Sequence, residues 1–152
     1  MSRLQLALNV DDLEQSIAFY TNLFGTEPAK VKPGYANFAV AEPALKLVLI
    51  ENPGRGGSLN HLGVEVTDTD TVDSEQRRLA LAGLASVDER DSTCCYAKQD
   101  KFWVEGAPNG ERWEVYTVLE DTQDFGQHAG ENEMTDPSST ADSESGSSVC
   151  CA

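Results

Sequence analysis

The chain has 152 residues, enough for one domain with a sizeable core or for two small modules packed together. It carries 26 acidic and 11 basic residues, a net charge of −15, so phosphate backbones and anionic membrane surfaces would repel it. No apolar run approaches the roughly 20 residues that span a bilayer, and the N-terminus lacks the pattern of a signal peptide. We therefore expect a cytoplasmic protein that binds neither nucleic acid nor membranes.

The first part of the chain repeats one pattern of elements. Apolar, strand-like runs begin at Gln5 (QLALNV) and at His61 (HLGVEV), and both end in turns that contain Asp. The first run leads into DDLEQSIAFYTNLFG, where apolar residues recur at helical spacing and Gly25 supplies a stop. The second run leads into DTVDSEQRRLALAGL, which carries a weaker stripe of the same kind.

Each expected helix is followed by several strand-like runs, with turns marked by KPG, AEPA, NPGRGG and APNG. This order predicts an α+β fold in residues 1–119, made of two βαβββ modules at about 1–54 and 58–119. Packing the two sheets together would form one curved cavity lined from both halves. Residues 120–152 hold eight acidic residues and no Lys or Arg, and their polar composition predicts a disordered acidic tail.

Three side chains are candidates for a metal site. His61 opens a strand, Gln5 occupies the equivalent position of the first module, and Glu114 lies in the last strand, where an unpaired buried carboxylate is costly. One imidazole, one carboxylate and one amide oxygen would leave coordination positions open for other ligands. The pattern is also compatible with a hydrogen-bonded His61, a Gln5 that faces water, and a Glu114 that pairs with Arg112 or Lys46.

Cys94 and Cys95 are adjacent in a polar segment. Neighbouring Cα atoms lie about 3.8 Å apart, whereas disulfides favour about 4.4–6.8 Å, so we expect two free thiols in a reducing compartment. Thiolates select soft, thiophilic centres. Lys101 could lower the thiol pKa or hold an oxygen substituent of a substrate. The alternative is a pair of small, partly buried hydrophobic side chains.

Cys150 and Cys151 repeat the pairing near the end of the expected tail. One hypothesis is that this second dithiol captures a soft ion and passes it to the first. A dispensable tail explains the sequence equally well.

From Leu4 to Val118 the chain resembles the vicinal oxygen chelate superfamily, the glyoxalase and extradiol-dioxygenase-like metalloproteins with paired βαβββ modules. Within it, the chain is most similar to the carbon–arsenic lyase and cadmium-induced protein group. The segments that carry the resemblance are QLALNVDDLEQSIAFY, KPGYANFAV, LKLVLIENP, LNHLGVEV, TCCYAKQDKFWV and GERWEVYTV.

By position, the resemblance implies Gln5, His61 and Glu114 as metal ligands, although Gln5 replaces the His of some relatives. It implies Fe(II)- and dioxygen-dependent cleavage of the C–As bond of trivalent methyl or aromatic arsenicals, with release of arsenite. Cys94 and Cys95 would then hold the arsenic atom, and the protein would be a monomer or a homodimer. The alternative function is binding of cadmium or arsenite without turnover. A glyoxalase-like isomerase would leave the cysteine pair without a role.

Overall fold

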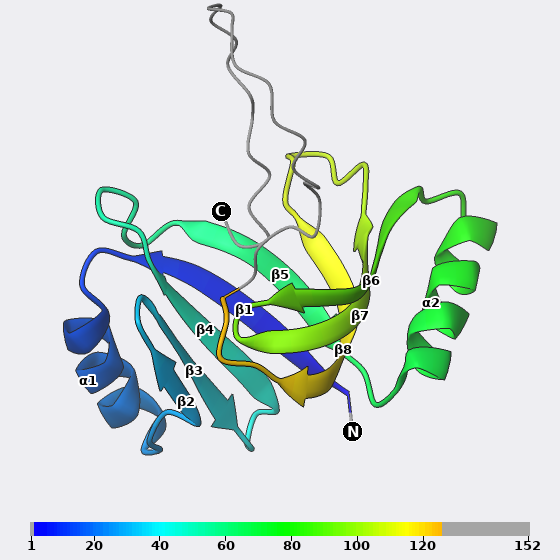
Figure 1. The fold of residues 1–152 in the computed structure, drawn as a ribbon. Helices are drawn as coiled ribbons and strands as arrows, with labels where there is room; N and C mark the ends of the chain where they lie inside the picture. Colours follow the sequence, from blue (N-terminus) through cyan, green and yellow to red (C-terminus); the bar gives the residue numbers. More distant parts are fainter. Residues whose placement is uncertain (1, 126–152) are drawn as a thin grey trace, which may run out of the picture.

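A computed structural model of the chain describes residues 2–125. The two modules predicted from the sequence are confirmed, because each consists of a strand, a helix and three further strands (Figure 1). None of the helices in this part of the chain is long and apolar enough to cross a membrane. The elements in chain order are β1 (Arg3–Val10), α1 (Leu13–Phe24), β2 (Lys30–Lys32), β3 (Tyr35–Val40), β4 (Leu45–Glu51), β5 (Leu59–Glu65), α2 (Thr69–Leu81), β6 (Ser86–Cys94), β7 (Ala97–Val104) and β8 (Trp113–Asp121).

All eight strands form one curled sheet in the order β2-β3-β4-β1-β5-β8-β7-β6. The first strands of the two modules, β1 and β5, pair antiparallel at its centre. Each also pairs in parallel with the last strand of its own module, β4 or β8. The helices lie at opposite ends of the sheet, on its outer side (Figure 1). The two modules therefore share one half-barrel, with β1 and β5 running through the middle.

The sheet is buried on both faces, which explains its long apolar runs. On the outer face, α1 covers a cluster that includes Phe38, Leu47 and Leu49, and α2 covers one that includes Phe102 and Val115. Alternate residues point to the inner face, because side chains along a strand switch sides at every position. The inner face therefore receives the polar residues of β1, β5 and β8.

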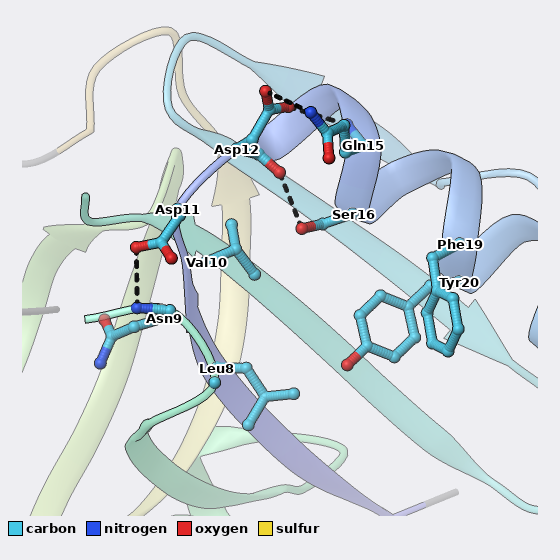
Figure 2. Close-up of a pocket in the computed structure, with 11 residues that line it drawn as sticks. Leu8, Asn9, Val10, Asp11, Asp12, Gln15, Ser16, Phe19 and Tyr20 are labelled. Carbon is cyan, nitrogen blue, oxygen red and sulfur yellow. Dashed lines mark hydrogen bonds between the residues drawn. The ribbon is translucent and has the colours of Figure 1, made fainter. Parts of the chain in front are cut away.

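Local signals fix the first helix where the sequence predicted it. Asp12 caps the start of α1 by accepting a hydrogen bond from the backbone N–H of Gln15 at 2.9 Å, as Figure 2 shows. Gly25 ends the helix in the left-handed region at φ 63°, and its N–H donates to the carbonyl of Thr21. The surface groove of about 340 Å³ drawn in Figure 2 lies between α1 and the end of β1. It contains none of the predicted site residues.

The last strand, β8, runs to Asp121, two residues beyond the predicted domain boundary. Its continuation contacts the hairpin between β6 and β7, where Thr122 N–H donates to the carbonyl of Tyr96 and Cys95 N–H donates to that of Phe125. The rest of the predicted tail, including Cys150 and Cys151, lies outside the described residues.

Candidate active site

Strand register brings the three predicted metal ligands together on the inner face. Gln5 of β1 pairs with Gly63 of β5, and Gly63 pairs with Glu114 of β8, so these positions form one row across three strands. His61 lies two residues before Gly63 on the same face of β5. All three polar side chains are buried, between 2 and 4% exposed.

Their terminal atoms converge on one point. Gln5 Nε2 lies 3.1 Å from His61 Nε2 and donates to Glu114 Oε1 at 2.8 Å. The distance from His61 Nε2 to Glu114 Oε1 is 3.2 Å. Neighbouring ligands around an octahedral ion with bonds of about 2.1 Å are separated by roughly 3 Å. The spacing and the donor types therefore fit one face of a divalent ion, provided that the Gln5 amide presents its oxygen instead of its nitrogen.

The centre depends on an amide as its third donor. Within residues 2–125, no three His, Cys, Asp or Glu side chains gather in a way that could hold a metal ion. Only two of the predicted ligands, His61 and Glu114, are of these types. An amide oxygen is neutral, so this donor set carries a single negative charge, on Glu114, whereas a set with two carboxylates would carry two.

Gly63 leaves the space in which Gln5 and Glu114 meet. A Cβ atom at this position would lie 3.2 Å from Gln5 Nε2, from Glu114 Cγ and from Tyr116 Cε1. These contacts are tight, so a methyl group would have to push ligand side chains apart by a few tenths of an ångström.

We expect Gly63→Ala to lower the free energy of unfolding by about 1–3 kcal/mol, the usual cost of overpacking, and to weaken divalent metal binding. Urea denaturation and cobalt titration of the variant would measure the two effects. Unchanged values for both would show that the side chains move aside freely and that the glycine has no role in the site.

A chain of asparagines orients His61. Its Nδ1 lies 2.7 Å from Asn60 Oδ1, and Asn60 Nδ2 in turn donates to Asn9 Oδ1 at 3.0 Å. Because an amide oxygen only accepts, His61 carries its proton on Nδ1 and points the lone pair of Nε2 toward the centre. Trp103 supports the ring from the side, edge to face at 5.5 Å between centroids. Sequence reasoning missed Asn9 and Asn60, although Asn60 directly precedes the candidate histidine.

Lys101 lies beside the metal candidates, fully buried on the inner face of β7. Its ammonium is 3.2 Å from Glu114 Oε2 and 3.4 Å from Glu89 Oε2, and it also lies over the Trp103 ring. Burial alone would raise the pKa of Glu114, but the attraction of the Lys101 ammonium opposes it, and that pKa is lowered to about 2. Glu114 is thus a carboxylate with Oε1 facing the centre. The predicted contact of Lys101 with substrate stays a prediction.

The cysteine pair lies at the hairpin between β6 and β7. Cys94 ends β6 with a buried side chain. Cys95 and Tyr96 form the two-residue turn, with φ values of 55° and 60°. Two consecutive positive φ values are typical of a type I′ turn, which usually contains Asn and Gly. A turn built from Cys and Tyr is strained by roughly 1–3 kcal/mol per residue. Such strain persists because other contacts hold the turn.

The contacts that hold this turn come from the first module and from the end of β8. Lys30 Nζ donates to the Tyr96 carbonyl at 3.0 Å, and the Tyr96 hydroxyl donates to the carbonyl of Pro33 at 2.9 Å. The ring of Tyr96 packs against Tyr35 with 5.5 Å between centroids. These contacts hold the β6–β7 hairpin of the second module against the strands of the first module.

The two sulfur atoms lie 3.3 Å apart, so Cys94 and Cys95 are not bonded to each other, as predicted. The expectation of two free thiols is wrong for Cys95, which is disulfide-bonded. The pair therefore becomes a dithiol only after that bond is reduced.

The thiols and the metal candidates share one inner face. Cys94 packs in a cluster with Ala7 and Tyr35, and Ala7 is the cross-strand partner of His61. Burial holds the pKa of the Tyr35 hydroxyl, which lies in the same cluster as Cys94, well above its usual range. Within the described residues, the buried Oε1 of Gln99 has no hydrogen-bond partner, while its Nε2 donates to the Cys94 carbonyl.

Residues 3–115 match the model of the glyoxalase/bleomycin resistance protein/dioxygenase superfamily. The chain belongs to this superfamily. The fold agrees, since the chain is similar to the Mn(II)-bound glyoxalase from Novosphingobium aromaticivorans. The glyoxalase match has a TM-score of 0.56 and 18% identity, covering 85% of this chain and 44% of the glyoxalase. An extradiol ring-cleaving dioxygenase from B. fuscum matches with a TM-score of 0.54 and 22% identity over 79% of this chain and 33% of the dioxygenase.

Closer similarity is found to two curated proteins. The chain is 60% identical to the cadmium-induced protein CadI of Mycobacterium tuberculosis (strain ATCC 25618 / H37Rv), over 99% of this chain and 93% of CadI. It is 64% identical to the trivalent organoarsenical cleaving enzyme of Thermomonospora curvata, over 80% of each chain. The group suggested by the sequence resemblance is thereby confirmed.

Proposed function

We propose that this protein is an enzyme that cleaves the C–As bond of trivalent organoarsenicals and releases arsenite, with Fe(II) as cofactor and dioxygen as oxidant. One observation carries the proposal: a buried Gln5–His61–Glu114 set and a vicinal cysteine pair share the inner face of one half-barrel. The 64% identity to a protein named trivalent organoarsenical cleaving enzyme supports the choice of substrate.

The cysteines would bind the substrate by ligand exchange. A trivalent arsenical R–As(OH)₂ reacts with two thiols to give two S–As bonds and two water molecules, while the third bond, to carbon, is kept. Because Cys94 and Cys95 are held at adjacent positions, the second S–As bond forms at a high effective concentration. A pentavalent arsenical has no free positions for two thiolates and should not react. The buried Oε1 of Gln99 beside Cys94, which has no hydrogen-bond partner among the described residues, is suited to accept a hydrogen bond from the As–OH group that remains after the first S–As bond has formed.

The polar side chains would hold the metal and keep coordination positions open. His61 offers the lone pair of Nε2. Lys101 forms an ion pair with Glu114 Oε2, so that only Oε1 of this carboxylate faces the centre. Iron bound there would supply the activation of dioxygen next to the C–As bond. The burial of the surrounding residues excludes water from this space.

The overall reaction balances with one molecule of dioxygen. Methylarsonous acid, CH₃As(OH)₂, and O₂ together contain the atoms of arsenous acid, As(OH)₃, and formaldehyde. Arsenic stays trivalent, the methyl carbon is oxidised by four electrons, and dioxygen is reduced by four. No further reductant is needed for the turnover itself.

The test is an anaerobic experiment with the reduced full-length chain. The protein is loaded with Fe(II), trivalent methylarsenical is added, and arsenite and formaldehyde are followed with and without air. We expect both products in equal amounts with air and neither without it. Arsenite release that is independent of oxygen or of iron would overturn the proposed chemistry.

The similarity to proteins named cadmium-induced supports a second function, binding of a soft ion without turnover. Sequestration needs the cysteines but neither His61 nor Glu114, whereas cleavage needs both sets. Stoichiometric retention of cadmium or arsenite, with no product formed in air, would favour this second function.

A further inference from the structure

Gln5 is the one predicted ligand with two different atoms at its end, since only its Oε1 can coordinate a metal. In the structure its Nε2 faces the centre, donating to Glu114 Oε1 at 2.8 Å, and its Oε1 accepts from the Tyr116 hydroxyl at 2.5 Å. The amide must therefore turn over before its oxygen can bind a metal. The contacts of the amide group decide which atom faces the centre.

Tyr116 has two acceptors within reach of one hydrogen. Its hydroxyl lies 2.5 Å from Gln5 Oε1 and 2.8 Å from Glu65 Oε2. Glu65 is held by two cations, with its Oε2 at 3.2 Å from Arg3 and at 3.3 Å from Lys46 Nζ. A carboxylate between two cations only accepts hydrogen bonds. The hydroxyl can thus donate to Gln5 or to Glu65, but not fully to both.

We propose that Tyr116, backed by Glu65, is a positioning residue that turns the Gln5 oxygen toward the metal. When the hydroxyl donates to Glu65, its oxygen accepts a hydrogen bond from Gln5 Nε2, and Gln5 Oε1 then faces His61 and Glu114. This inference rests on the proposed function, because it presumes a metal held by Gln5, His61 and Glu114.

The exchange leaves no buried group without a partner. Without metal, Gln5 Nε2 donates to Glu114 and Tyr116 donates to Gln5. With metal, Glu114 Oε1 and Gln5 Oε1 turn to the ion, Gln5 Nε2 donates to Tyr116, and Tyr116 donates to Glu65. Tyr116 is fully buried and Gln5 is 4% exposed, so an unmade hydrogen bond here is costly and water cannot replace it.

A comparison of two backgrounds isolates this effect. Tyr116→Phe removes the hydroxyl but keeps the ring, over which Lys46 lies. In the natural chain we expect it to weaken Co(II) binding by about 10- to 100-fold, as for other residues that orient ligands. In a Gln5→Glu background both terminal atoms are oxygens, so orientation no longer matters, and we expect Tyr116→Phe to cost at most about threefold.

The measurement is calorimetric titration of the full-length metal-free chain with Co(II), together with the visible spectrum of the complex. Equal losses in both backgrounds would mean that Tyr116 acts only on packing and would overturn the inference, as would the absence of any loss. Glu65→Gln gives a second test if Tyr116→Phe fails to fold, since the glutamine amide can also donate to the Tyr116 hydroxyl and so no longer fixes the direction of its hydrogen bond; the same dependence on the background is expected.

The same titration separates this inference from the proposed function. If the natural chain binds no Co(II), the metal centre fails and the inference fails with it. If the natural chain binds Co(II) and Tyr116→Phe binds it equally well, only the role of Tyr116 is overturned.

Discussion

Replacing Cys94 and Cys95 with serine is expected to abolish arsenite release while leaving metal affinity unchanged. Serine keeps the size of the side chain but forms no strong bond to trivalent arsenic. A single replacement leaves one S–As bond and loses the intramolecular second bond, which is worth about 10²- to 10⁴-fold in affinity. We therefore expect either single variant to bind the arsenical about 10²- to 10⁴-fold more weakly. Titration with trivalent phenylarsenical under reducing conditions measures this.

The matched control for the cysteine variants is His61→Ala. This variant should lose Co(II) binding and arsenite release but keep the affinity of the reduced dithiol for the arsenical. The two sets of variants thus separate substrate binding from metal binding. Full turnover by the double serine variant would contradict the assignment of the cysteine pair.

Removing the buried charge of Lys101 should have the largest effect on stability. Lys101→Met keeps a long side chain but leaves Glu114 without its ion pair, and the loss of one partner of a buried pair costs about 3–5 kcal/mol. We expect a decrease of this size in the free energy of unfolding at pH 7, measured by urea denaturation of the metal-free protein. Adding Glu114→Gln should restore much of the loss, because both charges are then absent.

The dependence on pH follows from the same pair. The pKa of Glu114 is about 2 in the folded metal-free chain and 4.5 without the protein environment. Its contribution to stability is therefore present above pH 4.5 and is lost as the pH falls toward 2. In Lys101→Met the pKa of Glu114 rises, so the difference from its unfolded value narrows and the loss of stability between pH 4.5 and pH 2 should become smaller. Lys98→Met is the control, because Lys98 lies nearer the surface and pairs with exposed Asp91; it should change stability by about 0.5 kcal/mol or less. An equal effect of both lysine variants would contradict the special role of Lys101.

Several features followed from the sequence alone. The two βαβββ modules were predictable because strand and helix periodicities are local, and so was the end of α1 at Gly25. The adjacent cysteines were correctly expected not to bond with each other, since covalent geometry fixes their Cα separation. Gln5, His61 and Glu114 were singled out by their places in the repeat and by the family resemblance, although their role as metal ligands stays a prediction.

The tertiary structure alone decided how these residues meet. The pairing of β1 with β5 and of β5 with β8 determines that Gln5, Gly63 and Glu114 share a row, and no local pattern encodes register between strands so far apart in the chain. The alternative considered for Glu114 was an ion pair with Arg112 or Lys46, whereas the structure places Lys101 and His61 beside it and pairs Lys46 with Glu65. Long side chains reach whichever buried partner the sheet curvature brings near. The sequence therefore determined which chemical groups are present, and the closure of the half-barrel determined which of them act together.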